Sequence, residues 1–147
     1  MLDSEPDAVL GPFSSPGAQA TPWASVLAAW SLGGMCFTTG GQERKARNLE
    51  RNPHCALTTG TSALTGVDVV IEGVASVVHE RSEREQAVAD FERKHGAHLT
   101  GPEGSWYGLG EAVIAGEVRL YRVAPTVGFA FGKLPTSSQT RYTWPSR

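Results

Sequence analysis

Apolar positions along this chain predict a protein built mainly of β-strands. The clearest strand pattern covers residues 68–80, where apolar residues recur on both faces. Such a strand fits one face against a barrel interior and the other against a helix or partner. Gly73 within it indicates a bend or a close approach of two backbones. Further apolar runs predict strands over residues 21–30, 35–39, 54–59, 113–123, 127–131 and 140–144.

Two segments have a helical pattern instead. Residues 42–51 predict a short helix that has only Ala46 and Leu49 to pack. Residues 80–95 predict a longer helix, which Ser82 caps. A glycine-rich loop is expected to follow it. Six or seven strands with two helices favour a mainly β fold, a small antiparallel Greek-key barrel with helical insertions.

The length of 147 residues allows one domain with a hydrophobic core. Residues 1–17 are rich in Pro, Gly and Ser and predict a flexible segment, so we place a single domain over residues 18–147. The net charge of −2 and the isoelectric point near 6.1 argue against a general nucleic-acid-binding protein.

Residues 8–42 carry no Asp, Glu, Lys or Arg. Prolines and the Gly33-Gly34 pair interrupt this segment, so no run of about 20 apolar residues remains and no membrane span is expected. Its apolar area, with that of the two-faced strand, predicts a homodimer. The acidic N-terminus does not resemble a signal peptide, and Cys36 and Cys55 match no zinc or redox spacing. We therefore expect a cytoplasmic protein.

The segment after the strand over residues 35–39 has the features of an anion site. Thr38 and Thr39 offer hydroxyls, a glycine pair follows, and Arg44 and Lys45 lie on the first turn of the predicted helix. The start of a helix also presents unpaired N–H groups and the positive end of the helix dipole. We therefore predict that this corner binds an anion, most simply a phosphate group.

An ordered set of motifs resembles the FMN-binding split-barrel proteins related to pyridoxamine 5'-phosphate oxidase, especially the branch that uses FMN or the deazaflavin F420. The resemblance covers roughly residues 17–144. It implies a split β-barrel and a homodimer, with the cofactor and a small-molecule substrate at the subunit interface. The motifs are Phe37-Thr38-Thr39-Gly40, Arg44-Lys45-Ala46-Arg47-Asn48-Leu49, Asn52-Pro53, Asp68-Val69-Val70-Ile71-Glu72-Gly73, Val123-Ala124-Pro125-Thr126, Phe131-Gly132-Lys133 and Gln139-Thr140-Arg141-Tyr142.

The resemblance also implies roles for individual residues. The cofactor phosphate would be held by Thr38, Thr39, Arg44 and Lys45. The strand from Trp23 to Leu27, which includes Ser25, would border the ring system. Trp106, Arg141 and Trp144 would close the site, from the same subunit or the other one. The basic patterns that hold the substrate phosphate in the vitamin-B6 oxidases are missing, so we do not expect pyridoxamine phosphate as the substrate.

The expected function is a flavin-dependent oxidoreductase with FMN as the default cofactor. F420 is the alternative, because Arg47 and Arg51 could hold its long anionic tail. No acid or base stands out, and no catalytic residue is assigned. No metal is expected, because no Glu completes a zinc motif beside His95 and His98. Rival readings are a non-catalytic flavin or haem carrier or sensor, with His54 or His79 as the haem ligand, and a cofactor-free dimeric barrel.

Overall fold

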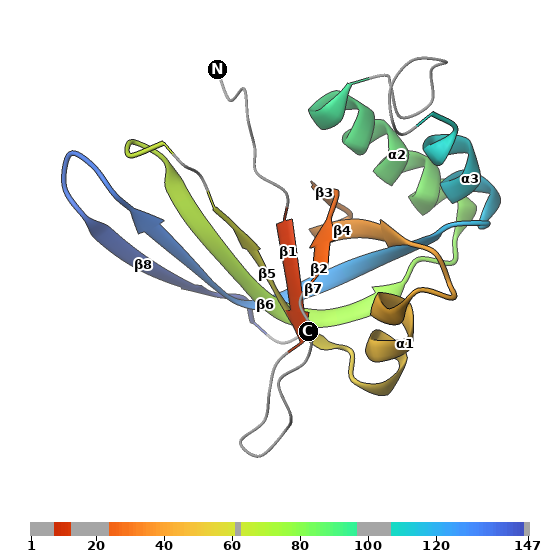
Figure 1. Cartoon of the computed structure of the whole chain (residues 1–147), viewed down its shortest axis with the longest axis horizontal. Helices are drawn as coiled ribbons and strands as arrows, with labels where there is room; N and C mark the ends of the chain where they lie inside the picture. Colours follow the sequence, from red (N-terminus) through yellow and green to blue (C-terminus); the bar gives the residue numbers. More distant parts are fainter. Residues whose placement is uncertain (1–7, 13–23, 61–62, 97–106, 146–147) are drawn as a thin grey trace.

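The computed structural model describes residues 8–12, 24–60, 63–96 and 107–145. Within these residues, eight antiparallel strands form one sheet that carries three helices (Figure 1). The strands are β1 (Ala8–Pro12), β2 (Ala24–Val26), β3 (Ala28–Ser31), β4 (Gly34–Thr39), β5 (His54–Thr59), β6 (Val67–Val77), β7 (Arg119–Gly132) and β8 (Ser138–Thr143). The helices are α1 (Arg44–Arg51), α2 (Arg81–His95) and α3 (Leu109–Ala115).

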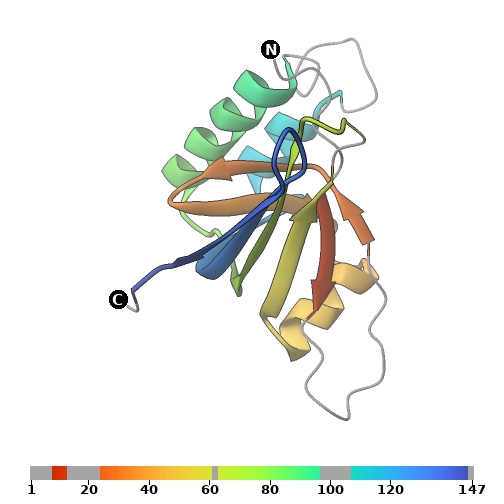
Figure 2. The ribbon, with the colours of Figure 1, turned by 90° about the vertical axis from the view of Figure 1, so that its left-hand side faces the viewer.

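The order of the strands closes the sheet into a barrel. Hydrogen-bonded neighbours follow the path β2-β1-β5-β6-β7-β4-β3, and β8 adds to β7. The path starts at β2 and ends at β3, and only Leu27 separates these two strands along the chain. The two edges of the sheet are therefore tethered to each other, which curls the sheet (Figure 2). The predicted mainly β, antiparallel barrel is confirmed.

Alternate residues of the strands supply two separate hydrophobic clusters, one on each face of the sheet. In β4, for example, Cys36 belongs to the outer cluster and Phe37 to the inner one. The inner cluster consists of Val26, Ala28, Phe37, Leu49, Cys55, Leu57, Ala75, Tyr121 and Val123. The outer cluster consists of Ala29, Cys36, Val78, Ala87, Val88, Phe91, Val113 and Leu120. Strands β4 and β7 therefore contribute side chains to both clusters. In β6, for which the sequence predicted two covered faces, Ile71, Gly73 and Ala75 are buried on one face, and the residues of the other face are partly or fully exposed.

Helices α2 and α3 cover the outer face beside the β3–β4 hairpin (Figures 1 and 2). Polar contacts, in addition to apolar ones, hold α2 against the β3–β4 hairpin. The hydroxyl of buried Ser31 donates to the Asp90 carboxylate over 2.6 Å. The carbonyl oxygen of Ala28 accepts from Lys94 Nζ at 3.1 Å and from His95 Nε2 at 2.8 Å. The hairpin and α2 are thus joined at both ends of β3.

Strand β7 crosses most of the molecule without interruption. It pairs with β4 and β6, and its last six residues pair with β8. The sequence predicted that Ala124-Pro125 would break it, but Pro125 lies inside the strand opposite Gly73. The register shifts between Glu72 and Gly73, and a Cβ at Gly73 would lie 2.1 Å from the Ala124 carbonyl oxygen. The close backbone approach predicted for Gly73 is therefore confirmed.

Four local predictions differ from the structure. Residues 8–12, expected to be flexible, form β1, because their backbone pairs with both β2 and β5. Val113 lies in helix α3 rather than in a strand. Gly108 and Gly116, both in the left-handed conformation, limit this helix to seven residues, about two turns. Helix α2 begins after Glu80, and Ser82 makes no capping hydrogen bond. The long strand predicted over residues 21–30 is interrupted at Leu27, although its first three residues lie outside the described part.

Candidate functional site

The turn that joins β4 to α1 brings polar groups of distinct kinds together. Strand β4 ends at Thr39 and helix α1 begins at Arg44. The Glu43 N–H donates to the Gly40 carbonyl oxygen over 3.0 Å, which closes the turn. We refer to residues 39–45 as the corner. It coincides with the segment for which the sequence predicted a phosphate site.

Three donors of the corner converge on one carboxylate, that of Glu43. The Thr39 hydroxyl donates to Glu43 Oε2 over 3.1 Å, and the Gly40 N–H donates to Oε1 over 3.0 Å. The Lys45 ammonium lies 2.7 Å from Oε2. The corner therefore holds an anionic group, and that group belongs to the chain itself.

The protonation of Glu43 reflects these contacts. The hydrogen bond from the Lys45 ammonium, and then the one from the Gly40 amide, hold the pKa of the Glu43 carboxyl below its usual value. The Glu43 side chain is 51% exposed and the Lys45 side chain 24% exposed. An ion pair this open to water stabilises a fold by about 0–1 kcal/mol. Strand β4 and the turn place the Thr39 hydroxyl and the Gly40 amide, whereas the Glu43 carboxylate is open to water and only weakly held.

Arg119 is a further basic residue of this region that the sequence alone did not indicate. It begins β7 and pairs directly with Thr39 of β4. Its Nη1 donates to Glu50 Oε1 of helix α1 over 2.6 Å. Its guanidinium covers Gly41 so closely that a Cβ there would lie 2.9 Å from Nε. Only the register between β4 and β7 places it here, and that register is not visible in the sequence.

Three arginines line the exposed face of α1. Arg44, Arg47 and Arg51 are all exposed, while Ala46 and Leu49 are buried on the opposite side of the helix. Their spacing of three and four residues places them on one stripe. Within the part of the chain that the structure describes, none of the three has an ion-pair or hydrogen-bond partner. The stripe continues the positive charge of the corner along α1.

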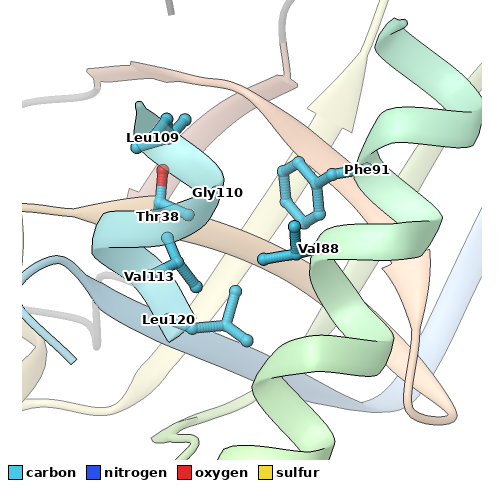
Figure 3. A pocket seen from close by; sticks show the side chains of 7 residues that line it. All are labelled: Thr38, Val88, Phe91, Leu109, Gly110, Val113 and Leu120. Atoms are coloured by element: carbon cyan, nitrogen blue, oxygen red, sulfur yellow. The ribbon is translucent and has the colours of Figure 1, made fainter. Parts of the chain in front are cut away.

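Thr38 lies away from the corner, on the opposite face of the sheet from Thr39. It lines a narrow pocket between the sheet and helices α2 and α3 (Figure 3). The hydroxyl of Thr38 is the polar side-chain group of a lining that is otherwise apolar, so this pocket has no group that could act as an acid or base. The lining residues are Thr38, Val88, Phe91, Leu109, Gly110, Val113 and Leu120.

Arg141 is also distant from the corner within one chain. It is exposed in β8 and pairs with Phe129 of β7. Phe129 lies ten residues beyond Arg119 on the same strand, which corresponds to roughly 30 Å along an extended backbone. The structure therefore does not bring Arg141 to the corner of its own chain.

Trp144 directly follows β8, the strand that contains Arg141. Its backbone N–H donates to the Thr126 carbonyl oxygen over 3.1 Å, and its half-buried ring lies against Gly128. Ser25 belongs to β2, where its backbone pairs with Val9 of β1. Trp23 and Trp106 lie outside the described residues. Of the predicted site residues, the structure thus brings together Thr39, Arg44 and Lys45.

Other kinds of site have less support in the described residues. No group of three His, Cys, Asp or Glu side chains gathers there to hold a metal ion. His54 and His79 are both exposed. Cys36 and Cys55 are free thiols that belong to different hydrophobic clusters. Among the described helices, none has the length and apolar character that a membrane crossing requires.

Comparison with protein families gives one match. The family described as pyridoxamine 5'-phosphate oxidase matches residues 6–129. No protein of curated function matches the chain.

Solved structures with a similar fold have varied descriptions. A conserved hypothetical protein of Mycobacterium tuberculosis is 21% identical, with a TM-score of 0.62 over 90% of this chain and 82% of that one. A NimC/NimA family protein of Clostridium acetobutylicum is 11% identical, with a TM-score of 0.62 over 92% and 83%. The haem storage protein HutZ of Vibrio cholerae is 16% identical, with a TM-score of 0.57 over 93% and 85%. At these identities the likeness concerns the fold alone.

Proposed function

Because this chain belongs to the pyridoxamine 5'-phosphate oxidase family, we propose that it is a flavin-dependent oxidoreductase that binds the phosphate of FMN at the corner. The observation that carries the proposal is the convergence of Thr39, Gly40 and Lys45 on a carboxylate. The oxygens of that carboxylate stand in for phosphate oxygens, since both are anionic acceptors of charge-assisted hydrogen bonds. The donor set therefore fits the group that the family implies.

Each residue of the corner has a separate task in this proposal. Lys45 supplies a full positive charge with three donors, and Thr39 and Gly40 supply directional donors. Arg44 lies exposed on the first turn of α1 and adds a second full charge with a planar set of donors. Bound flavin itself supplies the hydride or electron transfer. The chain binds and orients the cofactor, and none of its residues is assigned as an acid or base.

A homodimer completes the proposed site. Strand β8 and the adjoining ends of β6 and β7 form an arm (Figure 1). Apolar side chains stay exposed on it, among them Val67 at 53% and Tyr142 at 53%. A second copy that covers this arm would bury them. It would also bring its own Arg141 and Trp144 towards the corner of the first copy. Trp23, Ser25 and Trp106 stay proposed members of the same groove.

The cofactor F420 is the second candidate, and the stripe of Arg44, Arg47 and Arg51 is the observation in its favour. These residues have no anionic partner in the described structure and extend from the corner along α1. A long anionic tail would neutralise several of them, whereas the single phosphate of FMN would not. FMN is the simpler fit, because the corner alone satisfies its phosphate.

The test is a titration of cofactor-stripped protein with FMN, and separately with F420, followed by the fluorescence of the ligand. The Arg44→Ala/Lys45→Ala variant removes both charges, and Arg81→Ala/Arg93→Ala removes two charges from α2 as a control. Each lost hydrogen bond to a charged group costs about 1.5–3 kcal/mol, so each substitution should weaken FMN binding roughly 10- to 100-fold. The control should bind as the wild type does.

The same titration separates the rival functions. If the double variant still binds FMN as the wild type does, the phosphate does not bind at the corner. An absorption spectrum of haem in the purified protein would instead support a carrier of the kind that HutZ represents. A folded dimer that binds neither flavin nor haem would overturn the proposal and leave a barrel without a cofactor.

A further inference from the structure

The carboxylate of Glu43 occupies the donors that a ligand anion would need. Thr39 Oγ1, the Gly40 amide and Lys45 Nζ lie 3.1, 3.0 and 2.7 Å from its two oxygens. An incoming phosphate cannot accept from the Thr39 hydroxyl or the Gly40 amide while Glu43 holds them, and it must share the Lys45 ammonium with the Glu43 carboxylate. Ligand binding at the corner is therefore an exchange of one anion for another.

The position of Glu43 is not explained by helix capping. Glu43 is the residue that precedes α1, where a side-chain acceptor usually binds the free N–H groups of the first helical turn. Its carboxylate makes no such bond. It turns back towards Gly40 and Thr39 instead, and helix α1 begins without a side-chain cap. Among the described residues, no side chain therefore caps the N–H groups at the start of α1, beside the corner.

We propose that Glu43 is a tethered competitor, a carboxylate of the chain itself that any anionic ligand must displace from the corner and that thereby lowers the affinity of the corner for the phosphate of FMN. This inference rests on the proposed function of the corner as an anion site. Exchange of the carboxylate for another monoanion replaces one negative charge by one negative charge. The displaced carboxylate stays within a side chain's length of the corner and repels the incoming anion. A monoanion therefore gains little from the exchange.

For a phosphate monoester, the attraction to the cations of the corner is larger relative to the cost of displacing Glu43. It carries a charge close to −2 above its second pKa of about 6, and it has three acceptor oxygens. The second charge acts on Lys45 and on exposed Arg44, which the Glu43 carboxylate does not contact. Because Glu43 is half exposed and weakly held, it can leave the donors without disturbing the fold. The corner should therefore admit FMN and discriminate against phosphodiesters and carboxylates.

The experiment compares the wild type with Glu43→Gln, which keeps the shape of the side chain and removes its charge. The binding of FMN is measured at pH 8 beside that of riboflavin, which lacks the phosphate. The chemical shift of the Gly40 amide is followed in titrations with inorganic phosphate and with dimethyl phosphate, a monoanionic diester. We expect Glu43→Gln to tighten FMN binding about fivefold and to leave riboflavin unchanged. We also expect it to tighten the binding of inorganic phosphate at least as much as that of dimethyl phosphate, because the displaced carboxylate repels a dianion more strongly than a monoanion.

The chain offers a matched control in Glu85→Gln. The Glu85 side chain is 49% exposed, compared with 51% for Glu43, and it also pairs with a basic residue, Arg81. It lies on α2, so its loss should change none of these measurements. If Glu43→Gln does not fold, Glu43→Asp keeps the charge and withdraws it by one methylene group. That variant should also bind FMN more tightly than the wild type.

The outcomes separate this inference from the proposed function. Equal FMN affinities of the wild type and Glu43→Gln, with binding lost in Arg44→Ala/Lys45→Ala, would overturn the role of Glu43 and retain the flavin site. If no flavin binds either protein but the Gly40 amide responds to inorganic phosphate more strongly in Glu43→Gln, the competitor role stands and the flavin function falls. An amide that responds to phosphate in neither protein overturns the inference.

Discussion

Thr38 and Thr39 are consecutive residues of β4 whose hydroxyls serve opposite faces of the sheet. Thr39 is 3% exposed and donates to Glu43 in the corner. Thr38 lines the apolar pocket beneath α2 and α3 (Figure 3). The two residues therefore provide matched hydroxyls, one inside the corner and one outside it.

This pair allows a direct test of the corner. Replacing Thr39 by Val keeps the shape and removes one donor, and a net hydrogen bond is worth about 0.5–1.5 kcal/mol. We expect Thr39→Val to weaken FMN binding about 2- to 12-fold in a fluorescence titration. Thr38→Val should bind FMN as the wild type does, because its hydroxyl lies in the outer pocket. Equal losses in both variants would contradict this division of the two faces.

The contact between Gly73 and Ala124 predicts a large effect of a single methyl group. A Cβ at Gly73 would overlap the Ala124 carbonyl oxygen of β7, and backbone cannot move aside as a side chain can. We expect Gly73→Ala to lower the free energy of unfolding by about 1–3 kcal/mol. Gly60→Ala is the control, because a Cβ at Gly60 meets no atom within 4 Å. Urea denaturation of both variants measures the difference, and a stable Gly73→Ala protein would refute the close approach.

The contact between Ser31 and Asp90 predicts a pH dependence. The Ser31 hydroxyl, and then Gln86 and Arg93, hold the pKa of Asp90 below its usual value. Since the folded protein favours the ionised carboxylate, this stabilisation is present above the usual Asp pKa of about 3.9 and disappears as the pH falls through the lower folded value. We expect Asp90→Asn to be less stable at pH 7 and to lose less stability than the wild type between pH 5 and pH 3. Urea denaturation across this range would show parallel curves if the contact were without effect.

Both thiols should be inert in the native protein. Burial raises the pKa of Cys36 and of Cys55 to about 12 each. The thiolate fraction at pH 8 is then about a thousandfold lower than that of an ordinary exposed cysteine. A chromogenic disulfide reagent should label neither residue in the folded state and both in guanidinium. Rapid labelling of one thiol in the native protein would show that its hydrophobic cluster opens.

Helices and strands whose ends are marked by local sequence signals could be predicted well. The strand predicted over residues 54–59 is β5 with the same bounds, and the helix predicted over residues 42–51 begins only two residues later than expected. The glycine pair before α1 and Asn52-Pro53 after it encode these limits within a few residues. Helix α3 was missed because seven residues show too little of a helical period.

The same distinction between local and long-range signals applies to the residues of the candidate site. Thr39 and Lys45 could be predicted because they lie within six residues of each other and share one turn. Arg119 could not, since it reaches Thr39 through the register of two strands that are eighty residues apart in the chain. The direction of the Glu43 side chain was also hidden, because the sequence at the start of a helix suggests a cap there rather than a return to the preceding turn.

The length and late position of β7 have a consequence for how the chain folds during synthesis. Until residues 119–132 are present, the remaining ladders form two separate pieces, β3 with β4 and β2-β1-β5 with β6. Each piece ends in an open strand edge, at β4 and at β6, which β7 pairs with in the finished protein. During synthesis on the ribosome the barrel therefore cannot close until β7 has emerged, and the two waiting edges are the places where a chaperone would be needed most.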